Sequence, residues 1–373
     1  MARTTGNASD LITFTRASTG TFLGSNGLLQ TATTNTPRVE YDANGVAKGL
    51  LIEEARTNQF LYSNDLTNAV WGVISATAST SSEVAPDGTT TATLLTATGS
   101  GAMFVRGSLS GGTQYAFSFF AKNSSSGWVG CSNAGFFASF DIQNGAVGTV
   151  GDGTASIQNY GNGWYRCSWV PADTSFNTAF RIRLAAGDND FATTNETGHF
   201  FGPQAETGTF PTSYIPTSGA TATRSADIAS VSVSEFGYNQ AQGSVVVEQS
   251  IFQTAGNSVA WQIDDGSQSD RYVFNSYNGN TAVIVSNAAQ ASLTHTGQSA
   301  DVVYKHGFAW ASNDFVSTYD GGAIQSDTSG SLPTVTTVRL GKDAGTSPLN
   351  GHIKSINYYP LRLSDAKLQE LTS

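Results

Sequence analysis

The feature that most constrains the fold of this chain is a repeated two-residue alternation of apolar and polar side chains. In Gln114–Ala121, the residues Tyr115, Phe117 and Phe119 share one face of an extended strand. Phe180–Leu184 alternates apolar residues with arginines, and Trp164–Trp169 places Tyr165, Cys167 and Trp169 on one face. Such segments recur about every dozen residues, which is the spacing of antiparallel sandwiches. No helical period competes with this pattern.

Composition supports the same fold class. The 373 residues include 40 Gly, 21 Phe and 13 Tyr, while only 12% are charged. So many aromatic side chains can bury enough apolar surface to offset the entropy cost of folding, so we expect an ordered chain. Abundant Gly, Ser and Thr suit short strands joined by polar turns. The length exceeds what one core usually supports. We therefore expect an all-β protein of two antiparallel β-sandwiches, the first of them a jelly roll, with one short C-terminal helix.

A proline-punctuated segment divides the two halves. We expect the strand that ends at Phe201 to stop at Gly202-Pro203, and Pro211 and Pro216 to keep the following residues out of a sheet centre. Tyr214 and Ile215 would anchor this extended tether to the face of a neighbouring domain.

The predicted domain boundaries follow from these signals. They are an N-terminal arm and attachment segment at 1–58, the jelly roll at 59–201, a connector at 202–242 and the second sandwich at 243–373. Residues 1–58 hold too few large apolar side chains for a core, so we expect them to lie along the first domain or a sister chain. Ser364 is predicted to cap a final helix that turns Leu368 and Leu371 inward.

Charge and cysteine content exclude some partners. A net charge of −10 and the lack of a basic run argue against nucleic acid and anionic membranes. Cys131 and Cys167 can pair, but two cysteines are no disulfide framework. With no apolar run of signal-peptide or membrane-span length, we expect synthesis and assembly in a cytoplasm.

Three groups of residues are similar to known families. Leu349–Leu371, preceded by Phe315–Gly322, resembles the final strand and helix of concanavalin-like (laminin-G-like) sandwiches. Trp71, Tyr115–Lys122 and Gly163–Trp169 resemble jelly-roll carbohydrate-binding modules. In order, Ile12–Gly20, Gly49–Asn58 and Gln204–Pro216 are similar to tail or head fibre proteins of tailed bacteriophages.

This resemblance implies a virion appendage, assembled in the bacterial host cytoplasm, that takes part in receptor binding and host attachment. It implies contact with other virion proteins through the N-terminal region, a homotrimer by analogy with phage fibres, and adhesion to host surface polysaccharide. A purely structural spacer without a ligand is the plainest alternative.

Glycan binding needs an exposed aromatic face with polar groups beside it. Trp128, in a turn-rich run, is the first candidate, followed by Tyr277 at a Gly/Asn turn and by Trp261 near Asp264. Most sandwich aromatics belong to the core, which is what we expect of Trp164, Trp169 and Trp310.

Cofactor and catalytic signals are sparse. Asp264, Asp265 and Asp270, and separately Asp188 with Asp190, form turn-borne acidic groups of a kind that can collect Ca²⁺, although Asp is also an ordinary turn residue. No other cofactor is expected. Adjacent Glu53 and Glu54 point to opposite faces of a strand, so we expect no acid–base pair there, but an ion pair of one with Arg56.

We therefore expect no enzyme. The alternative is a glycosidase or lyase on the second sandwich, for which Glu248 and Asp264 are the only carboxylates we can name.

Overall fold

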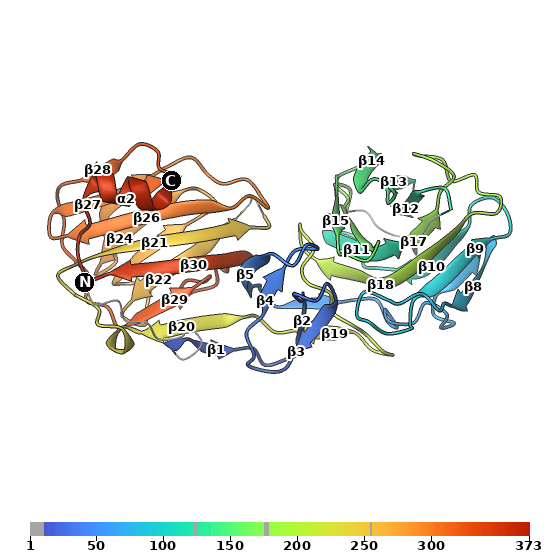
Figure 1. The fold of residues 1–373 in the computed structure, drawn as a ribbon, viewed down its shortest axis with the longest axis horizontal. Helices are drawn as coiled ribbons and strands as arrows, with labels where there is room; N and C mark the ends of the chain where they lie inside the picture. Colours follow the sequence, from blue (N-terminus) through green and yellow to red (C-terminus); the bar gives the residue numbers. More distant parts are fainter. Residues whose placement is uncertain (1–10, 123–124, 134, 175–178, 254–255) are drawn as a thin grey trace.

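The computed structural model describes residues 11–122, 125–133, 135–174, 179–253 and 256–373. The predicted arm at Met1–Asp10 and the first two residues of the Asn123–Trp128 run lie outside these ranges. The described chain forms two β lobes side by side along one axis, with the short strands β2 (Gly20–Leu23) and β3 (Leu29–Ala32) between them (Figure 1). The all-β prediction is confirmed. Among the described residues, no helix has the length and apolar character needed to span a bilayer.

The jelly-roll lobe consists of two six-stranded antiparallel sheets around an aromatic core. The first sheet has the order β14 (Ala146–Val150), β13 (Phe136–Asp141), β12 (Trp128–Asn133), β17 (Ala179–Leu184), β10 (Met103–Ser108) and β7 (Gly72–Ile74). The second has the order β15 (Thr154–Asn159), β16 (Tyr165–Val170), β11 (Tyr115–Lys122), β18 (Thr197–Thr207), β9 (Thr93–Ala97) and β8 (Ala76–Thr80). The predicted inward face of Phe117, Phe119, Cys167 and Trp169 forms this core.

The C-terminal lobe pairs two seven-stranded sheets. One has the order β1 (Thr13–Thr15), β20 (Ile228–Ser232), β29 (Thr337–Leu340), β22 (Val259–Asp264), β23 (Arg271–Asn275), β24 (Asn280–Val285) and β25 (Ala288–Thr294). The other has the order β28 (Gln325–Asp327), β27 (Asp314–Tyr319), β26 (Tyr304–Ala311), β21 (Gln242–Ile251), β30 (Gly351–Tyr359), β5 (Ala47–Ile52) and β4 (Val39–Tyr41). Helix α2 (Asp365–Thr372) covers β26 and buries Leu368, and Ser364 caps it as predicted.

The N-terminal segment differs from our expectation. We expected it to lie along the first domain or a sister chain, yet β1 pairs with β20 and β5 pairs with β30, so these strands belong to the C-terminal lobe. Phe14 and Ile52 are buried in that lobe's core. The segment needs few apolar residues because it adds only β1, β5 and β4 at the margins of two sheets, and other strands supply most of the core.

The predicted connector, residues 202–242, is also not one continuous extended tether. Strand β18 continues through Gly202-Pro203, contrary to the predicted stop, because its pairing with β11 shifts register there and Gly202 adopts φ 59°. A bulge tolerates a proline that a regular ladder excludes. Residues 208–221, which we call the tether, carry no strand or helix.

Beyond the tether, β19 (Ala222–Arg224) pairs with β6 (Arg56–Asn58), and η1 (Val233–Glu235) follows β20. Tyr214 and Ile215 are buried, and Tyr214 packs on Phe120 and Phe201 of the jelly-roll lobe, which confirms the predicted anchor. A short hairpin of β2 (Gly20–Leu23) and β3 (Leu29–Ala32) lies in the same junction.

Candidate functional site

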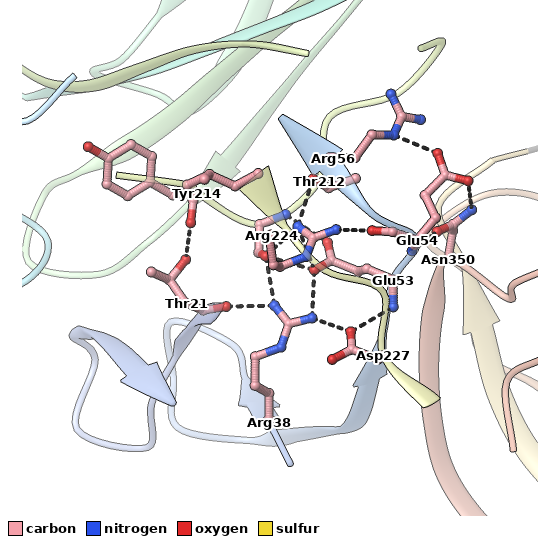
Figure 2. Close-up of polar contacts among 12 residues, drawn as sticks. Thr21, Arg38, Glu53, Glu54, Arg56, Thr212, Tyr214, Arg224, Asp227 and Asn350 are labelled. Carbon is pink, nitrogen blue, oxygen red and sulfur yellow. Dashed lines mark hydrogen bonds and ion pairs between the residues drawn. The ribbon is translucent and has the colours of Figure 1, made fainter. Parts of the chain in front are cut away.

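The junction between the lobes is held by a buried network of arginines and carboxylates. Arg38 reaches Glu53 with 2.8 Å between Nη2 and Oε2, and it also contacts Asp227 (Figure 2). Arg224 lies 3.1 Å from Glu53, and Arg16 lies 3.0 Å from Asp227. All five side chains are at most 1% exposed. The network therefore joins the N-terminal segment to the chain that leaves the tether.

The tether supplies further partners to Glu53. Ser213 donates from its backbone nitrogen and its hydroxyl, each at 2.7 Å. Burial alone would raise the pKa of Glu53, but Arg224, Arg38 and these donors lower it to about 2. Glu53 is thus an ionised structural carboxylate, and its neighbour Glu54 forms the predicted pair with Arg56.

A cleft of about 270 Å³ opens beside this network, between the two lobes. The jelly-roll wall is the outer face of β15 and β16, and the tether closes one side. The opposite wall comes from β4, β5, the loop after β21 and the loop before β26. Hydroxyl and amide side chains form the largest group in the lining: Thr154, Ser156, Gln158, Ser168, Thr209, Thr212 and Ser213. The other lining residues are charged (Glu40, Lys48, Glu53, Arg166, Asp301), apolar (Leu51, Ala155, Val170, Pro211) or aromatic (Tyr160, Phe210, Phe252).

The alternation of the sequence explains this jelly-roll wall. In β15, Ala155 and Ile157 pack against the core, so Thr154, Ser156 and Gln158 point outward and are exposed. Hydroxyls and amides that line a concave surface beside aromatic rings can bind a ligand rich in hydroxyl groups.

Charged groups lie at both walls of the cleft. On the C-terminal side, Glu40 accepts a 2.8 Å hydrogen bond from His352 Nε2 and lies 3.6 Å from Lys48. Burial would raise the pKa of Glu40, but His352 and Lys48 lower it to about 2. On the jelly-roll side the charged residue is Arg166, which is 6% exposed.

The predicted glycan-binding aromatics lie outside this cleft. Trp128 is half-buried on β12, where its ring lies against Gly148 beside Asp188. Tyr277 is half-buried in the turn between β23 and β24, where its carbonyl lies against Gly297. A role for either in ligand binding stays a prediction. Trp261 is 0% exposed in the core of the C-terminal lobe, so its predicted stacking on a sugar is wrong. Trp261 lies on the core-facing side of β22, so its ring is buried even though the acidic turn follows it closely in the sequence.

The predicted calcium ligands do not converge. Asp264 is buried and its carboxylate binds Arg339 Nε at 2.8 Å. Asp265 accepts a hydrogen bond from Ser267 of its own turn, and Asp270 accepts one from the backbone of Ser286 in the turn between β24 and β25. Within the ranges that the structure describes, no three His, Cys, Asp or Glu residues are grouped so as to hold a metal. Asp188 and Asp190 likewise bind Thr149 and Ala192. Asp265 and Asp190 therefore have the turn role that was the simpler alternative, whereas Asp264 is in an ion pair and Asp270 and Asp188 bind the backbone of other segments.

Other predicted residues are placed as follows. Trp164, Trp169 and Trp310 are at most 1% exposed, as expected of packing residues. Cys131 and Cys167 are free thiols in the jelly-roll core. Glu248 pairs with Lys354 on one sheet and Asp264 with Arg339 on the other, so the two named carboxylates do not form a catalytic pair.

The cleft residues were missed by the sequence analysis. Tyr160 stands at a Gly/Asn turn and Arg166 on the polar face of a strand, but neither feature differs from other turns and strands of this chain. Phe252 and Phe210 reach the cleft from distant segments. Of the segments that line the cleft, the tether was the one that the sequence singled out, because of its prolines.

Comparisons with known proteins give distant likenesses. No protein-family model and no curated protein sequence matches the chain. A SAP-like pentraxin from Limulus polyphemus is 12% identical over 35% of this chain and 70% of its own, with a TM-score of 0.29. Mouse laminin α1 domains LG4-5 are 10% identical over 68% and 85%, with a TM-score of 0.28. Trypanosoma rangeli sialidase is 10% identical over 75% and 60%, with a TM-score of 0.31. These scores are too low to assign a function.

Proposed function

We propose that this chain is a non-enzymatic adhesion protein that binds a glycan in the cleft between its two lobes. The observation that carries the proposal is the lining of the cleft, in which hydroxyl and amide side chains accompany the half-buried ring of Phe252, while Tyr160 and Phe210 are each 6% exposed. Aromatic faces suit the C–H side of a sugar ring, and the polar groups suit its hydroxyls. The buried junction keeps the two walls at a fixed separation, which reduces the ordering cost of binding.

The proposed location is a tailed-phage virion, as a tail or head fibre protein. Support comes from the three sequence strings that resemble such proteins, because they meet in one place. Arg16 belongs to the first string, Glu53 to the second and Ser213 to the third, and all three side chains join the same buried network. The likeness therefore covers a connected structural unit.

Filling the cleft is expected to abolish glycan binding. Ser156 is exposed on the cleft wall, so Ser156→Trp would occupy the space that a sugar needs without disturbing the core. We expect at least a tenfold loss of binding on an array of bacterial surface glycans, in line with about 1–3 kcal/mol for blocked contacts. Ser79→Trp is the matched control, since Ser79 is equally exposed on β8 at the other edge of the same sheet. Equal binding by both variants would refute the cleft as the site, and an absence of any wild-type binding would favour the spacer alternative.

A homotrimer is part of the proposal, since several weak sites on one particle bind far more tightly than one. The edge strand β7 offers an apolar surface, with Val73 37% and Ile74 48% exposed. Light scattering coupled to size-exclusion chromatography is expected to give three times the 39.0 kDa mass of the chain. A single-chain mass at high concentration would contradict this part of the proposal.

The enzymatic alternative has less support. Glu40 and Glu53 are the buried carboxylates of the cleft, and both are held ionised by cationic partners. A glycosidase needs one carboxylic acid that keeps its proton near neutral pH. Neither residue meets that requirement. Asp301 is the third carboxylate of the lining; burial raises its pKa, while Lys48 and His352 act in the opposite direction.

A further inference from the structure

One buried arginine of the junction differs from the others in its partners. Arg16, Arg38 and Arg224 each lie within 3.1 Å of a carboxylate. Arg166 is 6% exposed, yet no carboxylate of the described residues lies within ion-pair distance of it. A guanidinium stays ionised at neutral pH, and a buried charge is costly unless it is paired.

The contacts of Arg166 leave part of its donor capacity unused. Its Nη2 donates to Ser118 Oγ at 2.9 Å and to Thr212 O at 2.6 Å, its side chain also forms a hydrogen bond with Tyr160, and its guanidinium lies 5.7 Å from the ring centroid of Phe120. Its Nε is buried and has no acceptor in the described part of the chain. Neutral acceptors compensate a cation less well than a carboxylate does.

Arg166 lines the cleft together with Tyr160 and Ser168. Burial raises the pKa of Tyr160 to about 12, so its hydroxyl is a neutral partner. The carboxylates of the cleft lie elsewhere in the lining: Glu53 is neutralised by Arg38 and Arg224, while Glu40 and Asp301 belong to the C-terminal wall. The cation of the C-terminal wall, Lys48, lies 3.6 Å from Glu40, whereas Arg166 on the jelly-roll wall has no carboxylate partner among the described residues.

We infer that the cleft selects an acidic glycan, in which a sugar carboxylate binds Arg166 and the neighbouring hydroxyls bind the polar lining. This inference rests on the proposed glycan-binding function and adds the chemical class of the ligand. The net charge of −10 repels polyanions at long range, so the attraction has to come from this local contact. Arginine is the side chain best suited to a planar carboxylate.

The test compares uronic-acid-containing bacterial oligosaccharides with their carboxyl-reduced counterparts, which keep the same backbone and linkages. Binding to the full-length chain is measured by calorimetry. We expect at least one acidic member to bind about tenfold or more tightly than its reduced form, as for a charge-assisted hydrogen bond. Arg166→Gln should bring acidic binding down to the reduced level, and Arg166→Lys should restore part of the difference.

Matched variants separate the possible results. Arg181→Gln removes an arginine of β17 that donates a local hydrogen bond to Ala179 O, and it should leave the preference unchanged. Thermal unfolding of each variant shows whether the fold is retained. Equal binding of acidic and reduced forms that Ser156→Trp abolishes would overturn this inference and leave the proposed function standing. No effect of Arg166→Gln on a well-folded variant would also overturn it, and binding of neither form would contradict both.

Discussion

Replacing Arg38 with methionine is expected to lower the free energy of unfolding by about 3–5 kcal/mol, the range for breaking a buried ion pair from one side. Arg38 contacts both Glu53 and Asp227, and all three side chains are at most 1% exposed. Methionine keeps much of the side-chain length but leaves two buried carboxylates with one arginine fewer. The measurement is chemical denaturation followed by tryptophan fluorescence.

The matched control is a surface pair of the same type. Lys354 lies 2.8 Å from Glu248, but its side chain is 45% exposed. Lys354→Met should change stability by less than about 1 kcal/mol, because exposed pairs contribute little. Equal effects of the two substitutions would show that the junction network does not stabilise the fold.

Acid is expected to weaken the junction between pH 4.5 and 2. The pKa of Glu53 falls from 4.5 to about 2 on folding, so its contribution is fully present above 4.5 and is lost as pH drops toward 2. A shift of this size corresponds to roughly 3 kcal/mol. The measurement is the free energy of unfolding at a series of pH values.

Other carboxylates titrate in the same range, so a second variant isolates the Glu53 contribution. Glu53→Gln should be less stable at neutral pH and should show a flatter decline below pH 4.5. A wild-type profile that runs parallel to that of the variant would contradict the assignment.

The strands were predictable because their signal is local. Tyr115–Lys122 and Tyr165–Val170 alternate toward a core that nearby residues already imply, and both are strands. The C-terminal helix was predictable for the same reason, since its cap and apolar stripe lie within eight residues. Strand spacing then favours a sandwich without any knowledge of partners.

Pairing over long distances was not predictable. The partner of β5 is β30, and nothing in Ala47–Ile52 distinguishes β30 from the nearer jelly-roll edges. The ion network has the same property, since Arg16 and Asp227 lie 211 residues apart. An isolated arginine in a sequence carries no sign of whether it will be buried.

The candidate site was the least predictable part. Aromatics near turns drew attention to Trp128, Tyr277 and Trp261, but the cleft arises where two domains meet. Its walls come from segments that look like ordinary strands when each is considered alone. Arg166 gains its significance from the tether that covers it, through the carbonyl of Thr212.

The contribution of the first strands to the C-terminal lobe has a consequence for biosynthesis. His352, the hydrogen-bond partner of Glu40, is synthesised 312 residues after Glu40. β4 and β5 therefore remain unpaired with β30 while the jelly-roll lobe is being translated. Domains generally fold as units as they emerge. The opposite wall of the cleft is built on β5, which docks only when β30 is present. A nascent chain therefore cannot complete this wall of the cleft until β30 has been translated.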